Sequence, residues 1–135
     1  MPLNTMKGLL IDQLNELYAA EKHGAEMLPK LMRAASSPKL AAALRSHADE
    51  TKEHLSRLES VFEGLGAAPR RVESKGMKGL CQDCMKLADM AKAEPHVRDA
   101  ALIAVAQHVE HDEIAGYGCA RTWARLLGSA SGPSG

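Results

Sequence analysis

The chain has 135 residues, with 17 basic and 17 acidic side chains and a formal net charge of zero. This length fits one domain with a single core. The lack of a basic excess argues against a nucleic-acid partner, which requires many phosphate contacts. Hydrophobic residues make up 45% of the chain but aromatic residues only 3%. A core dominated by Ala and Leu, both strong helix formers, predicts an all-α protein.

The sequence contains no apolar run of signal-peptide or transmembrane length, because Asp12, Asn15 and Glu16 interrupt the N-terminal segment. The odd number of cysteines favours reduced thiols over a disulfide framework. We therefore expect a cytoplasmic protein with no membrane partner. Cys81 and Cys84 form a Cys-x-x-Cys pair, but zinc would need further ligands and a thioredoxin-like motif a βαβ unit. We therefore expect Cys84 to pack in the core and Cys81 to point elsewhere on its helix.

Four helices are predicted in chain order. The first covers about 5–33, and the second begins at a Ser37 cap followed by Pro38 and ends near Gly64. After the long linker "GAAPRRVESKG", the third helix covers about 77–92 and the fourth about 95–127. The domain is expected to span 1–128, with a flexible tail over 129–135.

Short loops inside each pair of helices and a longer middle connection predict a four-helix bundle made of two antiparallel helical hairpins. Residues in a helix advance by about 100° each, so spacing predicts which side chains face the core. On the first helix, leucines repeat at helical spacing and form one apolar stripe, or seam, and Glu21 falls in the middle of it. On the fourth, we expect Glu110 to lie centrally among the apolar positions, with His111 and Glu113 on opposite flanks.

The apolar faces of the second and third helices also carry acidic residues. His54 lies near the seam of the second helix and Glu50 at its border, whereas Glu53 points outside. Asp83 borders the seam of the third helix. His47 and His111 are expected to orient carboxylates rather than to bind directly.

Buried carboxylates repel one another unless they are protonated, paired with basic residues or bound to a cation. Few basic residues lie near these positions, apart from Lys22 and Arg121 at the margins. One or two divalent cations would satisfy the acids, and carboxylate with imidazole suits iron or manganese. Ferritin-like di-iron and di-manganese bundles hold their metals with Glu and Glu-x-x-His residues projecting inward.

The stretches "LYAAEKHGAEMLPKL" and "VRDAALIAVAQHVEHDEIAGYG" resemble the YciE/YciF family of ferritin-like bacterial stress proteins, and the resemblance extends over about 10–128. It implies a rubrerythrin-like bundle, usually a homodimer, with two divalent metal ions. Asp83 stands where the family commonly has Glu, and His54 follows Glu50 by four residues instead of three. The expected metal ligands are Glu21, Glu50, His54, Asp83, Glu110 and Glu113.

Two functional hypotheses follow. The first is a dinuclear iron or manganese protein of the stress response that acts on peroxide or oxygen. It would receive electrons from a separate partner, because three cysteines are too few for a Cys₄ iron module. The second is a metal-free structural or stress-protective dimer without catalytic activity. The sequence leaves open whether the protein is an enzyme.

Overall fold

The structure is a computed structural model that describes residues 4–90 and 94–131. Within them it contains four helices and no strand: α1 (Met6–Ala34), α2 (Pro38–Gly64), α3 (Lys75–Met90) and α4 (Pro95–Ser131). The prediction of an all-α bundle is confirmed. Helix α4 continues through Ser131, three residues into the expected tail, and the rest of that tail, 132–135, lies outside the described residues.

Local chemistry explains where the helices begin and end. The Thr5 hydroxyl accepts a hydrogen bond from the Gly8 amide at 2.9 Å and caps α1, while Ser37 caps α2 ahead of Pro38. Gly66 ends α2 with a φ of 68°, and the Ala67 amide reaches back to the Phe62 carbonyl. That pattern is a Schellman motif, which needs a left-handed residue.

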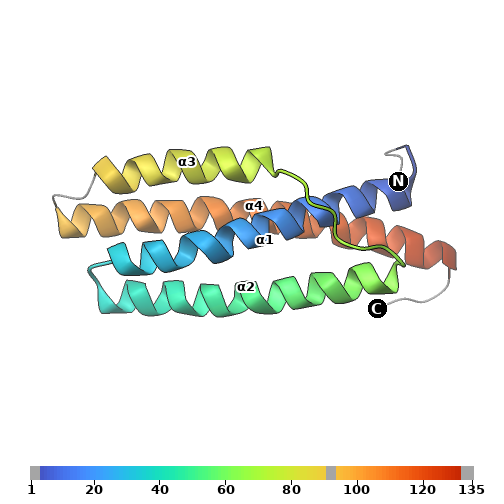
Figure 1. Cartoon of the computed structure of the whole chain (residues 1–135), viewed down its shortest axis with the longest axis horizontal. Helices are drawn as coiled ribbons and strands as arrows, with labels where there is room; N and C mark the ends of the chain where they lie inside the picture. Colours follow the sequence, from blue (N-terminus) through green and yellow to red (C-terminus); the bar gives the residue numbers. More distant parts are fainter. Residues whose placement is uncertain (1–3, 91–93, 132–135) are drawn as a thin grey trace.

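The helices pair as two hairpins, α1 with α2 and α3 with α4 (Figure 1). The hairpins join chiefly where α1 packs against α4. The linker after α2 crosses α1 to reach the start of α3 (Figure 1). Helices α2 and α4 instead face one another across a groove of about 690 Å³. Through this groove, other molecules can reach the interior of the bundle between α2 and α4.

Two apolar clusters form the core. One is built around Leu31, Met77 and Leu102, and the other around Leu14 and Phe62. Along α1 the two clusters meet just before Glu21, since Leu17 belongs to one cluster and Ala20 to the other. The bundle therefore carries a polar layer between two apolar ones. None of the helices in the described residues is long and apolar enough to cross a membrane.

Candidate metal centre

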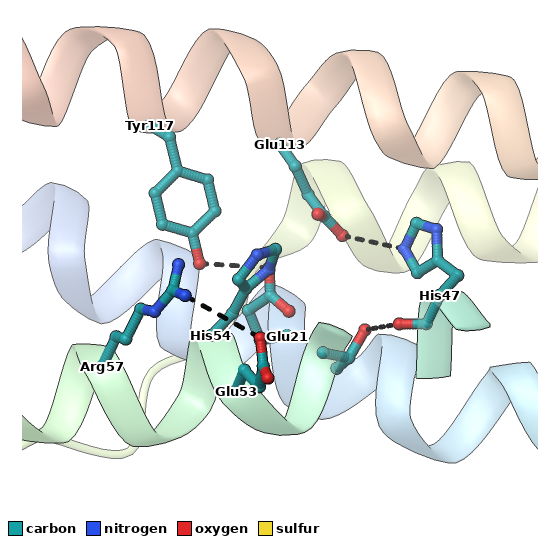
Figure 2. Close-up of polar contacts among 8 residues, drawn as sticks. Glu21, His47, Glu53, His54, Arg57, Glu113 and Tyr117 are labelled. Carbon is teal, nitrogen blue, oxygen red and sulfur yellow. Dashed lines mark hydrogen bonds and ion pairs between the residues drawn. The ribbon is translucent and has the colours of Figure 1, made fainter. Parts of the chain in front are cut away.

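Three side chains from three helices meet in the polar layer. Glu21 of α1, His54 of α2 and Glu113 of α4 each offer one ligand atom, and these atoms lie within 4.8 Å of one another. Glu21 is completely buried, Glu113 is buried, and His54 is partly exposed on the groove side. Figure 2 shows His54 lying over Glu21, between Tyr117 and Glu113. The cluster thus has an inner carboxylate and an outer edge that faces the groove.

Glu21 is held in this position by its neighbours. The Tyr117 hydroxyl donates a hydrogen bond to its Oε1 at 3.1 Å, and Nδ1 of His54 lies 3.4 Å from the same oxygen. Its other oxygen, Oε2, has no hydrogen-bond partner among the described residues, and neither does Nδ1 of His54. A buried carboxylate oxygen without a donor is costly, and in native proteins such a group calls for a partner.

The protonation of Glu21 follows from this environment. Burial, and next the charge of Glu113, raise the pKa of Glu21 to about 8, although the hydrogen bond from Tyr117 acts in the opposite direction. Burial also raises the pKa of the Tyr117 hydroxyl, and the nearby Glu21 charge adds to that rise. Without a cation, Glu21 therefore carries a proton at neutral pH. A metal ion that binds there must displace it.

Glu113 lies close to a second histidine, His47, as well as to the Glu21–His54 pair. Its Oε1 lies 3.8 Å from Nε2 of His47, as Figure 2 shows. The close approach and negative charge of Glu113 raise the pKa of His47, against the opposing effect of burial, and the charges of Glu50 and Glu110 raise it further. Glu113 thus lies between the Glu21–His54 pair and a second group of His47, Glu50 and Glu110.

The structure places the six predicted ligands in three different ways. Glu21, His54 and Glu113 come together in the cluster. Glu50 and Glu110 are exposed, but both line the groove beside the cluster. Asp83 is exposed on α3 and lines a different cavity, between α1 and α3. Glu53 points to solvent as expected and pairs with Arg57 at 3.8 Å.

The predicted orientation of α4, with Glu110 toward the core, is wrong. Glu113, not Glu110, is buried, because the core row of this helix runs through Leu102, Val105, Val109 and Ala120. Ile103 and Ile114, two apolar residues of the same helix, are instead 49% and 61% exposed. Apolar residues on both sides of α4 obscure its buried face.

Two residues of the site carried a weaker signal in the sequence. His47 was expected only to orient a carboxylate, and it does contact Glu113. Tyr117 was not assigned a role. It lies four residues after Glu113, so both side chains project from one face of α4. The four-residue spacing from Glu113 is therefore the sequence signal that points to Tyr117.

Comparison with known proteins is consistent with this architecture. The model of the family described as "Domain of unknown function (DUF892)" matches residues 5–132. The chain belongs to this family. It is 38% identical to Protein YciF of Escherichia coli K12 over 129 aligned residues. The alignment covers 95% of this chain and 77% of YciF. The resemblance to the YciE/YciF group is thereby confirmed.

Two solved structures have the same fold as this chain. YcfI of Rhodopseudomonas palustris matches with a TM-score of 0.90 and 39% identity, over 93% of this chain and 80% of YcfI. The crystal structure of the stress protein YciF of E. coli matches with a TM-score of 0.82 and 37% identity, over 95% of this chain and 80% of YciF. The helical bundle of this DUF892 protein is therefore the fold of its relatives.

Proposed function

We propose that this protein binds divalent iron or manganese through Glu21, His54 and Glu113. The observation that carries the proposal is the buried Glu21 carboxylate, whose Oε2 has no hydrogen-bond donor in the described residues and whose neighbour Glu113 is a second acid. No lysine or arginine forms an ion pair with either acid in the described part of the chain. A cation accounts for both acids and for the unpartnered His54 nitrogen.

The three side chains are of the kinds that bind divalent metal ions in proteins. Two carboxylates and one imidazole are ligands that suit iron, manganese and zinc. Three protein ligands leave coordination positions free for another molecule, as in catalytic metal sites. The groove beside the cluster would give such a molecule access.

A second ion would use the remaining acids. Glu113 lies close to both Glu21 and His47, and Glu50 and Glu110 line the same groove. In this proposal a second ion would be held by His47, Glu50, Glu110 and Glu113. Asp83, which lies in another cavity, would not take part.

When bound, a pair of iron or manganese ions would supply redox chemistry toward peroxide or oxygen. Electrons would come from a separate protein. The chain itself contributes a hydrogen bond from the Tyr117 hydroxyl to Glu21 and an apolar inner wall formed by Leu10, Leu14 and Leu58. YciF of E. coli is described as a stress protein. We propose a role in the stress response for this chain as well.

Metal content tests the proposal directly. Protein purified without a metal-affinity tag, and then reconstituted with ferrous or manganous ions, should contain near-stoichiometric metal. Glu21→Gln and Glu113→Gln should each lose it, whereas Glu53→Gln, which changes an exposed acid on α2, should retain it. Two ions in the parent and one in Glu110→Gln would support the dinuclear form. No metal in the reconstituted parent would contradict the proposal.

The groove favours a second candidate function, a structural homodimer. Val61 and Ile114 line it and are 45% and 61% exposed, which leaves apolar surface open to solvent. Glu50 and Glu110 lie on one stretch of α2 and α4, and Arg57 and Arg121 on the next. A second copy related by a two-fold axis could therefore place acids opposite arginines.

Sedimentation equilibrium distinguishes this candidate from the first. A dimer in the parent that is lost in Ile114→Glu, but kept in Ile103→Glu, would locate the interface at the groove, since Ile103 is exposed but does not line it. A metal-free dimer would favour the structural function, and a monomer in the parent would exclude it.

A further inference from the structure

A cavity of about 670 Å³ lies under the linker that joins the two hairpins, away from the groove. One wall is α1, with Tyr18, Lys22, His23 and Glu26, and the other is the linker, with Arg70 and Arg71. The volume is within the range of small-molecule sites, about 300–1,000 Å³. Figure 1 shows the linker passing across α1, which is why residues so distant in sequence share a cavity.

The linker is fixed in place. Asn15 of α1 is buried, and its Oδ1 accepts a hydrogen bond from the backbone amide of Arg70 at 2.7 Å, while its Nδ2 donates to the Ile11 carbonyl at 3.0 Å. Ser74, at the end of the linker, is also buried. The backbone that carries both arginines is therefore positioned by a buried amide, and their side chains are not involved in that contact.

The charges on this cavity are unbalanced. Lys22, Arg70 and Arg71 face a single carboxylate, Glu26, on a chain whose net charge is zero. None of the three cations forms an ion pair within residues 4–90 and 94–131. Nζ of Lys22 instead lies over the Tyr18 ring, 4.9 Å from its centroid.

Neighbouring acids are already engaged. Glu73, in the same linker, pairs with Lys78 at 2.7 Å, and Glu59 accepts the hydroxyl hydrogen bond of Tyr18 at 3.1 Å. Among the residues that line the cavity, Glu26 is thus the single carboxylate set against Lys22, Arg70 and Arg71. Guanidinium groups match phosphate oxygens in a bidentate geometry, and a lysine adds a point charge.

We infer that this cavity binds a phosphate-bearing small molecule, with Arg70, Arg71 and Lys22 holding its phosphates. The cavity is larger than a single phosphate group requires, so a diphosphate or a nucleotide is the fitting class. The site shares no residue with the candidate metal centre and does not depend on metal binding.

Calorimetric titration of the metal-free full-length chain with pyrophosphate, at low ionic strength, tests the inference. We expect saturable binding at one site that weakens as NaCl is added. Arg70→Gln/Arg71→Gln should weaken binding at least tenfold. Arg70→Lys/Arg71→Lys should restore part of the affinity, because charge is kept but the forked geometry is lost.

The matched control is Arg45→Gln/Arg125→Gln, which removes the same charge from exposed positions on α2 and α4. It should leave the affinity unchanged. Equal weakening in both double variants, or no binding in the parent, would overturn the inference. Circular dichroism would verify that each variant is folded.

Three further ligands define the class. ADP binding more tightly than pyrophosphate would identify a nucleotide, while citrate binding equally well would overturn the assignment to phosphate. Binding to vesicles of anionic phospholipid, without binding to soluble pyrophosphate or ADP, would overturn a small-molecule site in favour of a membrane surface.

Discussion

Tyr117 and Glu21 are 96 residues apart in sequence, yet the phenol of one donates a 3.1 Å hydrogen bond to the carboxylate of the other. The contact joins α1 to α4 inside the polar layer. It stabilises the charged form of an acid whose burial favours the neutral form. The pair therefore connects the packing of the two hairpins to the protonation of the candidate metal centre.

Replacing Tyr117 with Phe should weaken metal binding. Without the phenol the pKa of Glu21 rises further, so a metal ion must displace a more tightly held proton. We expect a loss of affinity of about 3- to 10-fold, the equivalent of one hydrogen bond of ~1 kcal/mol. The measurement is the metal dissociation constant at pH 7 and pH 8.5, and the loss should be smaller at the higher pH.

Tyr18→Phe is the matched control for this prediction. It removes the same hydroxyl from a tyrosine that bonds Glu59 on the surface instead of Glu21. Metal affinity should be unchanged in it. If both phenylalanine variants bind metal equally well, Tyr117 has no influence on the site.

The metal-free protein should become less stable as pH rises. Glu21 has a pKa of about 8 in the folded chain against an ordinary value of 4.5. A raised folded-state pKa contributes stability that is complete below pH 4.5 and is lost as pH rises through 8. The raised pKa of His47 acts in the same direction above its ordinary value of 6.5. The loss expected from Glu21 between pH 5 and 8 is about 3–4 kcal/mol, since each pH unit between the two pKa values costs about 1.4 kcal/mol.

Urea unfolding in the presence of a chelator, at pH 5, 6.5 and 8, measures this loss. Glu21→Gln cannot ionise, so its stability should change less with pH and should exceed that of the parent at pH 8. Saturating metal should reverse the trend in the parent only. Parallel pH profiles for the parent and Glu21→Gln would show that Glu21 does not titrate in this range.

The sequence predicted the helices well because capping and periodicity are local. Ser37, Pro38 and the glycines at 64 and 66 specify the limits of α2 without reference to the rest of the chain. The buried position of Glu21 followed from the leucines around it, which all pack on one side of α1. Local pattern was sufficient wherever one face of a helix was clearly apolar.

The site was harder to predict because it depends on how the hairpins dock. Helix α4 has apolar residues on several sides, and only its contact with α1 determines that Glu113 faces inward and Glu110 borders the groove. The anchoring of the linker by Asn15 is likewise a contact over 55 residues. No periodicity within a single helix contains that information.

Asp99, near the start of α4, connects the two hairpins at the end of the bundle where α1 is joined to α2. Its two carboxylate oxygens accept hydrogen bonds from the backbone amides of Ser36 and Ser37, at 2.7 and 2.8 Å. A residue of α4 thereby satisfies donors just before α2. Asp99→Ala should destabilise the protein by about 1–3 kcal/mol, because two charge-assisted bonds are lost.

Urea unfolding is again the measurement, with Asp49→Ala, an exposed acid on α2, as the control that should change stability little. Hydrogen exchange adds a local readout, since the amides of Ser36 and Ser37 should exchange faster in Asp99→Ala alone. Unchanged exchange would mean that these bonds do not persist in solution.

Two glycines on α4 should respond oppositely to alanine. A Cβ built on Gly116 would lie 2.7 Å from Cδ2 of Leu17, whose side chain is buried, and 3.0 Å from Nε2 of Gln13. A Cβ on Gly118 would meet no atom within 4 Å. Gly116 is thus required by the close approach of α1 and α4, whereas Gly118 only reduces helix propensity.

Gly118→Ala should raise the free energy of unfolding by about 0.5–1 kcal/mol, the helix-propensity difference. Gly116→Ala gains the same propensity but must displace Leu17, one turn before Glu21, so we expect a net loss of about 1–2 kcal/mol. Unfolding of both variants in urea measures the difference. Because Leu17 packs beside the polar layer, Gly116→Ala should also weaken metal binding while Gly118→Ala leaves it intact. Equal stabilisation by both alanines would show that α1 and α4 lie farther apart than the structure places them.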